Sequence, residues 1–284
     1  MSFVIKNGDL VERTEAAIDI EDRGYQFGDG VYEVIRVYNG KMFTGSEHID
    51  RLWSSASSIG IKIPYTKEEL QSQLQQLIQK NQLVLGTVYL QFTRGISPRK
   101  HPFPTDDVVP TFIAYTREVD RPVSKLQSGV KAMITDDIRW LRCDIKSLNL
   151  LGNLLANQKA AEAGCDEAVL HRDGRVTEGS HSNVSIVKQG EVYTHPANHF
   201  ILNGISRQLM LAICHKEGIK VNEQAFTLEE LSKADEIFLT GTTVEVMPVV
   251  ELEGTPVGGG KPGELTLKLQ ELFKQEIESQ CGKL

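Results

Sequence analysis

The chain has 284 residues, of which 40% are hydrophobic and 24% charged, as is typical of a globular enzyme large enough for two domains. Its formal net charge of −7 argues against broad nucleic-acid binding, which needs a basic face. The four cysteines form no CxxC pair, so we expect free thiols, no metal site and a cytoplasmic location. No apolar run approaches the roughly 20 residues that cross a bilayer, so we expect no membrane partner.

The first half of the chain alternates short strands and helices. Asn39-Gly40 predicts a tight hairpin turn, and Thr66 with Glu69 forms a capping box that begins a helix. The predicted strands span 30–38, 41–44, 88–93 and 109–115. The predicted helices span 46–59, with Ser46 as the N-cap, and 66–81.

A polar stretch over 116–129, which contains Pro122, interrupts this pattern and predicts a linker. We therefore expect a smaller domain over 1–120 and a larger one over 121–284. In the second, the predicted strands span 167–171, 175–178, 236–240 and 244–250, and the predicted helices span 149–163, 206–216 and 264–280. This mixed order, with many hairpins, predicts an α+β (mixed α/β) fold in both domains.

Two short motifs offer reactive groups. Lys146 stands in WLRCDIKSLNL, just before a predicted helix, and a lysine that loses solvent becomes a nucleophile toward carbonyl carbons. Glu178 stands in VTEGSHSN, where a carboxylate could serve a bound ligand. Taken singly, each motif fits a solvated side chain at least as well.

Three further motifs could bind anions. NGISR (203–207) opens a helix, whose free N–H groups attract phosphate, and TGTT (240–243) permits close backbone approach. In RGISPRKHPF (94–103), Arg99 and His101 alternate, so both side chains can face one side and bind a carboxylate. The alternative interpretations without anion binding are an ordinary helix cap for NGISR, a turn for TGTT and a solvated loop for RGISPRKHPF. Together, the motifs supply what a pyridoxal-phosphate (PLP) enzyme acting on amino acids requires.

Long blocks of the chain resemble the fold-type IV PLP enzymes. The similar blocks are DRGYQFGDGVYE (22–33), EHIDRL (47–52), TRGISPRKHPFP (93–104), DIRWLRCDIKSLNLLGN (137–153), VTEGSHSNV (176–184), THPANHFILNGISR (194–207) and LTGTT (239–243). The Arg99-Lys100-His101 block is similar to that of the members that act on D-amino acids. The resemblance implies a two-domain fold with the active site between the domains, and a Schiff-base lysine, Lys146, in the larger domain.

The resemblance also assigns roles to residues. Lys146 would hold PLP and serve as general base and acid, Glu178 would pair with the pyridine nitrogen, and Leu202 would pack on the ring. The residues expected around the phosphate are Arg51, Ile205, Ser206, Gly241 and Thr242. The family pattern has a hydroxyl residue at position 241, so Gly241 is a departure that removes one hydroxyl.

The substrate side is assigned in the same way. Tyr32, Arg99 and His101 would bind the α-carboxylate, the last two from the partner subunit of a homodimer, and Val34 would line the side-chain pocket. The implied reaction is ping-pong transamination of D-amino acids (D-alanine, D-glutamate) with 2-oxo acids. The alternatives are a branched-chain aminotransferase, an aminodeoxychorismate lyase, and a PLP-binding protein without catalytic activity.

Overall fold

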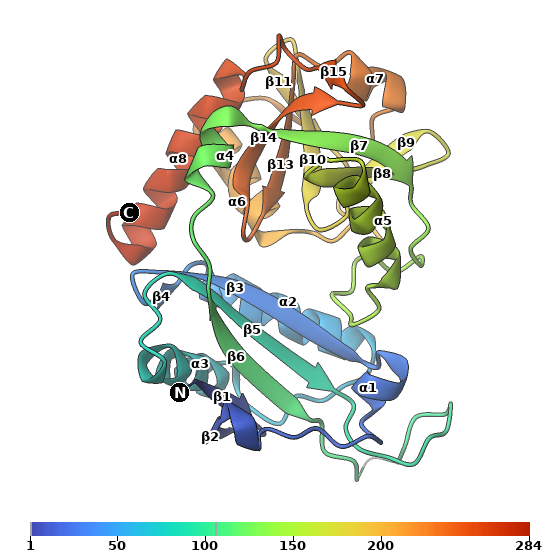
Figure 1. The fold of residues 1–284 in the computed structure, drawn as a ribbon, viewed down its shortest axis with the longest axis vertical. Helices are drawn as coiled ribbons and strands as arrows, with labels where there is room; N and C mark the ends of the chain where they lie inside the picture. Colours follow the sequence, from blue (N-terminus) through green and yellow to red (C-terminus); the bar gives the residue numbers. More distant parts are fainter. Residues whose placement is uncertain (1, 106) are drawn as a thin grey trace. The chain divides into compact units, whose positions relative to one another are not determined.

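The strands of the computed structural model, which describes residues 2–105 and 107–284, form two sheets in two separate units (Figure 1). Unit 1 comprises Met1–Asp120, Ile145–Asn149 and Ile277–Leu284, and unit 2 comprises Arg121–Asp144 and Leu150–Glu276. In the part of the chain so described, no helix is both long and apolar enough to cross a membrane.

Unit 1 is built on a six-stranded antiparallel sheet in the order β2-β1-β6-β5-β3-β4. Its strands are β1 (Phe3–Lys6), β2 (Asp9–Glu12), β3 (Gly30–Tyr38), β4 (Lys41–Met42), β5 (Gly86–Thr93) and β6 (Phe112–Glu118). Its helices are the short η1 (Arg13–Glu15), α1 (Arg23–Phe27), α2 (Gly45–Ser58) and α3 (Lys67–Lys80).

Strand β3 separates the core of unit 1 from the face that carries polar groups. Successive side chains of a strand point to opposite faces. Ile35 and Val37 are fully buried in a core formed with α2 and α3. The alternate positions, Tyr32, Val34 and Arg36, therefore lie on the other face of the sheet.

Unit 2 contains a nine-stranded mixed sheet in the order β12-β11-β10-β13-β14-β7-β8-β9, with β15 beside β14. The strands are β7 (Val130–Asp136), β8 (Glu167–Arg172), β9 (Arg175–Gly179), β10 (Asn183–Lys188), β11 (Glu191–Thr194), β12 (Val221–Glu223), β13 (Glu236–Gly241), β14 (Glu245–Leu252) and β15 (Thr255–Pro256). The helices are α4 (Val123–Ser128), α5 (Leu151–Glu162), α6 (Ile205–Lys216), α7 (Leu228–Ser232) and α8 (Glu264–Cys281), whose last residues belong to unit 1.

The capping box predicted at Thr66 is confirmed, and a second one forms at Thr227 with Glu230. The predicted N-cap of α2 is wrong: the helix begins at Gly45, and its N-cap is Thr44 in the left-handed region. Thr44 donates its hydroxyl to the carbonyl of Phe43 instead of capping the helix. The predicted linker is also wrong in detail, because β6 continues to Glu118 and α4 begins at Val123.

The placement of Lys146 in the larger domain is corrected as well. Its segment, Ile145–Asn149, belongs to unit 1 because it hydrogen-bonds to the start of β3. Tyr32 N donates to the Lys146 carbonyl over 3.0 Å, and Leu148 N donates to the Gly30 carbonyl over 3.0 Å. These long-range contacts are invisible in the local sequence.

Candidate active site

Lys146 is anchored through its backbone on unit 1. Besides its carbonyl contact with β3, its N–H donates to Ser55 Oγ on α2 over 3.2 Å. The Lys146 Nζ atom lies 3.4 Å from the Tyr32 hydroxyl and 4.4 Å from the centre of the Tyr32 ring. The structure thus brings the predicted reactive lysine beside a predicted substrate-binding residue.

Arg51 on α2 is fixed by a buried acid on β3. Its guanidinium donates to both carboxylate oxygens of Glu33, over 2.6 Å and 2.9 Å, and His48 Nδ1 lies 2.8 Å from Glu33 Oε2. Burial alone would raise the pKa of the fully buried Glu33, but nearby Arg51 and His48 hold it well below its usual range. Burial lowers the pKa of His48. Glu33 is therefore an anion that aligns Arg51.

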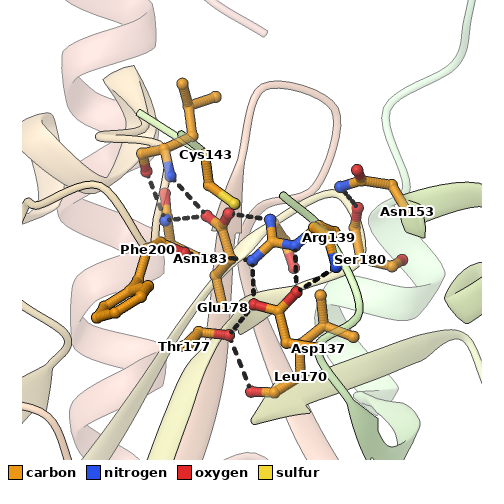
Figure 2. A network of polar contacts seen from close by, with 12 residues as sticks. Asp137, Arg139, Cys143, Asn153, Leu170, Thr177, Glu178, Ser180, Asn183 and Phe200 are labelled. Atoms are coloured by element: carbon orange, nitrogen blue, oxygen red, sulfur yellow. Dashed lines mark hydrogen bonds and ion pairs between the residues drawn. The ribbon is translucent and has the colours of Figure 1, made fainter. Parts of the chain in front are cut away.

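Glu178 on β9 is buried in a polar network of unit 2 (Figure 2). One of its carboxylate oxygens, Oε2, accepts from Asn183 Nδ2 over 3.0 Å and from the Leu202 N–H over 3.1 Å. The other, Oε1, accepts from Arg139 Nη1. Burial raises the pKa of Glu178 to about 7, although the Arg139 guanidinium favours the charged form.

Arg139 is itself held by Asp137. Two guanidinium nitrogens of Arg139 donate to the two Asp137 oxygens over 2.9 Å and 2.8 Å. Asp137 also accepts from Arg172 and from the Thr177 hydroxyl, each over 3.0 Å (Figure 2 shows the Thr177 contact). Glu178 thus has a fixed orientation, and a carboxylate so fixed fits a protonated ring nitrogen as a further donor.

The N-terminus of α6 fits a phosphate. Its N-cap is Gly204, which has no side chain to cap the first N–H groups, so those of Ile205 and Ser206 are available to an anion. A Cβ at Gly204 would lie 2.2 Å from Asn183 Oδ1, so any other residue there would require the Asn183 side chain to move. A phosphate and a pyridine ring nitrogen are two groups of PLP that this unit can accommodate.

Gly241 ends β13, and Thr242 follows it. A Cβ at Gly241 would lie 3.0 Å from Val244 Cγ2, so a hydroxyl residue there requires Val244 to move. Gly241 therefore lacks the expected hydroxyl, and Val244 packs closely against the space that a side chain at position 241 would need.

The loop that carries Arg99 and His101 packs against α1 in unit 1. The Arg99 guanidinium lies 4.4 Å above the Phe27 ring, and the His101 ring centre lies 5.7 Å from the same ring. Buried Arg23 donates to the Lys100 carbonyl over 2.7 Å and to Asp29 over 2.8 Å. The two side chains therefore lie on one side of an ordered loop.

The family model for class IV amino-transferases matches residues 30–252. The chain belongs to the class IV aminotransferases. Among curated relatives, a D-alanine aminotransferase from Listeria monocytogenes is 52% identical over 283 residues, covering 99% of this chain and 98% of the relative. One from Bacillus licheniformis is 52% identical over 280 residues, covering 99% of each chain. One from Staphylococcus haemolyticus is 48% identical over 282 residues, covering 99% of this chain and all of the relative.

Solved structures show the same aminotransferase fold. The Escherichia coli branched-chain amino acid aminotransferase has a TM-score of 0.91 at 27% identity, covering 96% of this chain and 93% of that one. A second branched-chain amino acid aminotransferase, solved in complex with N-(5'-phosphopyridoxyl)-L-glutamate, has a TM-score of 0.89 at 26% identity, covering 100% of this chain and 95% of that one. The predicted fold-type IV, α+β architecture is confirmed.

Unit 1 of this aminotransferase contains Tyr32, Val34, Arg51, Arg99, His101 and Lys146, and unit 2 contains Glu178, Leu202, Ile205, Ser206, Gly241 and Thr242. The sequence analysis missed the residues that orient these groups. Glu33, Arg139 and Asp137 were not singled out, although each stands inside one of the family-like blocks. Their charges are the signal that could have found them, since an acid inside an apolar strand needs a buried partner.

Proposed function

We propose that this aminotransferase moves the amino group of D-amino acids, such as D-alanine and D-glutamate, to 2-oxo acids with PLP as cofactor. The observation that carries this is the 48–52% identity to D-alanine aminotransferases over almost the whole chain. The ordered Arg99–His101 loop supports it, because it offers a two-point site for a carboxylate.

Lys146 holds the cofactor covalently and then moves the substrate proton. When bound, PLP supplies an electron sink for the negative charge that develops at the substrate Cα. The Lys146 Nζ atom, when it is not bound to the cofactor, would accept the Cα proton and donate it again later in the half-reaction. The Tyr32 hydroxyl, 3.4 Å from Nζ, restricts where that amine can lie.

The remaining residues bind and orient. Glu178 accepts a hydrogen bond from the pyridine nitrogen, while Leu202 packs on the ring. Arg51, Ile205, Ser206 and Thr242 hold the phosphate, together with the backbone N–H of Gly241. Tyr32, Arg99 and His101 hold the substrate α-carboxylate and so fix which face of Cα meets Lys146, and Val34 lines the side-chain pocket.

We also propose a homodimer in which Arg99 and His101 act in the active site of the partner subunit. Support comes from the apolar side chains exposed near this loop in unit 1: Ile20 (77% exposed), Tyr25 (77%), Ile96 (49%), Phe103 (64%) and Val109 (70%). Contiguous exposed apolar surface marks association sites. The free thiols of all four cysteines support a cytoplasmic location, as expected in a reducing compartment.

A donor panel tests the proposed function. The purified holoenzyme would be given D- and L-alanine, D- and L-glutamate, L-leucine and aminodeoxychorismate, with pyruvate or 2-oxoglutarate as acceptor. We expect rapid, ping-pong reaction of the D-amino acids and a change in visible absorbance on adding D-alanine. Equal rates with L-leucine would favour a branched-chain aminotransferase, turnover of aminodeoxychorismate a lyase, and no absorbance change a protein without catalytic activity.

A further inference from the structure

Among the described residues, Arg36 on β3 is a buried cation with no anionic partner. Its side chain is fully enclosed, with the residue only 1% exposed. In the described part of the chain, neither Nη1 nor Nη2 has a hydrogen-bond partner. The Arg36 guanidinium carbon lies 5.2 Å from the centre of the Tyr38 ring. A buried guanidinium is stabilised only when a carboxylate or similar acceptor satisfies its donors.

Arg36 shares a sheet face with two residues of the proposed substrate site. Tyr32, Val34 and Arg36 alternate along β3, and side chains two apart on a strand point the same way. Tyr32 and Val34 are only partly buried, so this face opens at their end of the strand. In the proposed site, a substrate held by its α-carboxylate at Tyr32, with its side chain along Val34, would point along β3 toward Arg36.

Among the described residues of β3, β5 and β6, this face carries no carboxylate. On the neighbouring strand β5, the positions opposite Tyr32, Val34 and Arg36 are Gln91, Tyr89 and Thr87. On β6, the positions that continue this face are Ile113, Tyr115 and Arg117. Among the described residues of β3, β5 and β6, the acids Glu33 and Glu118 lie at positions of the opposite face. An anion that neutralises Arg36 on this face must therefore come from outside these strands.

We propose that Arg36 binds the distal carboxylate of dicarboxylic substrates, so that D-glutamate and 2-oxoglutarate are preferred over D-alanine and pyruvate. This inference rests on the proposed D-amino-acid transamination and adds the substrate class. The planar guanidinium matches a carboxylate with two parallel hydrogen bonds. A substrate without that carboxylate leaves the buried cation unsatisfied, which is the usual basis of strong discrimination by polar pockets.

The test compares Arg36→Met and Arg36→Lys with the unmodified holoenzyme. Methionine fills a similar elongated space without charge, whereas lysine keeps the charge but not the two-point geometry. Exposed Arg117, on the same face of β6, provides the matched control Arg117→Met. For each protein, kcat/KM is measured in single half-reactions with D-glutamate, D-alanine, 2-oxoglutarate and pyruvate.

We expect Arg36→Met to reduce the D-glutamate to D-alanine ratio of kcat/KM about 100-fold, with a parallel change between 2-oxoglutarate and pyruvate. A 100-fold change corresponds to about 2.7 kcal/mol. Arg36→Lys should restore part of the ratio, and Arg117→Met should leave it within about twofold.

A second measurement does not depend on turnover. Glutarate, which has two carboxylates and no amine, should compete with D-glutamate more strongly than butyrate does. Arg36→Met should abolish that difference between the two inhibitors, because it removes the group that binds the second carboxylate.

An unchanged ratio in Arg36→Met, or an equal fall for all four substrates, would overturn the inference and leave Arg36 a structural residue. An equal change in Arg117→Met would overturn it too. The proposed transamination fails separately, if the unmodified enzyme reacts with neither D-alanine nor D-glutamate.

Discussion

Replacing Glu33 with glutamine tests whether the buried acid holds Arg51 in place. Glu33 is fully buried and accepts two hydrogen bonds from Arg51, over 2.6 Å and 2.9 Å. Glu33→Gln keeps the shape but removes the negative charge, which leaves the guanidinium, only 11% exposed, without its counter-ion.

The expected magnitude follows from this burial. Removing one partner of a buried ion pair typically costs about 3–5 kcal/mol, and we expect the lower end because the glutamine oxygen still accepts one bond. A loss of about 3 kcal/mol corresponds to a fall in Tm of roughly 6–12 °C for a chain of this size. PLP affinity should fall as well, since Arg51 is a proposed phosphate ligand.

Urea unfolding of the cofactor-free protein measures the effect, with Asp50→Asn as control. Asp50 pairs with Lys67 at the surface, where the side chains are 63% and 46% exposed, so its loss should cost below about 1 kcal/mol. The pKa of Glu33 lies below its usual range, so its contribution is present at neutral pH and is lost as pH falls through the lowered pKa. A difference below about 1 kcal/mol between Glu33→Gln and the unmodified protein at pH 7, or one equal to that of Asp50→Asn, would refute the reasoning.

Four further outcomes are expected. Lys146→Ala should lose nearly all transamination while still unfolding cooperatively; near-normal turnover would contradict the proposed role of Lys146 as general base. Arg99→Ala should raise KM for D-alanine by an amount equal to about 1.5–3 kcal/mol with a smaller effect on kcat, as steady-state kinetics would show. Burial raises the pKa of Glu178 to about 7, so in the cofactor-free protein this group makes folding less favourable as pH rises from 4.5 to about 7; denaturation of Glu178→Gln should lack that part of the pH dependence. Arg139→Met should raise the pKa of Glu178 further and weaken the visible absorbance change with D-alanine, whereas Arg139→Lys should restore part of that absorbance change. Equal behaviour of the two variants would exclude an electrostatic role for Arg139.

Local signals predicted much of the fold. The two capping boxes involve residues three apart, and the Asn39-Gly40 turn involves adjacent ones, so each could be found from a short window. The start of α2 could not, because Thr44 adopts a left-handed conformation that its sequence does not specify. Strands β1 and β2 were missed, and so were the longer β7 and β10, so strand length alone does not explain the omissions.

The candidate site also contains some residues that the sequence predicts and others that it does not. Lys146 and Glu178 were predicted as site residues because they stand in long blocks that resemble a known family, not because of their own spacing. The partners of Arg139 and Glu33 are visible only in three dimensions, since each lies distant in sequence or on another element. The unsatisfied state of Arg36 is likewise a property of packing, because strand alternation indicates its face but not its partners.

Asn183 connects two parts of unit 2: Glu178 on β9 and the start of α6 at Gly204. Its Nδ2 donates to Glu178 and to the Leu202 carbonyl, while its Oδ1 occupies the space that any side chain at Gly204 would need. One amide therefore contacts both Glu178, the proposed partner of the ring nitrogen, and the start of α6, the proposed phosphate site. A larger residue at position 204 would displace the Asn183 amide, which also donates to Glu178. A substitution at the proposed phosphate site would therefore also disturb the carboxylate proposed to bind the ring nitrogen.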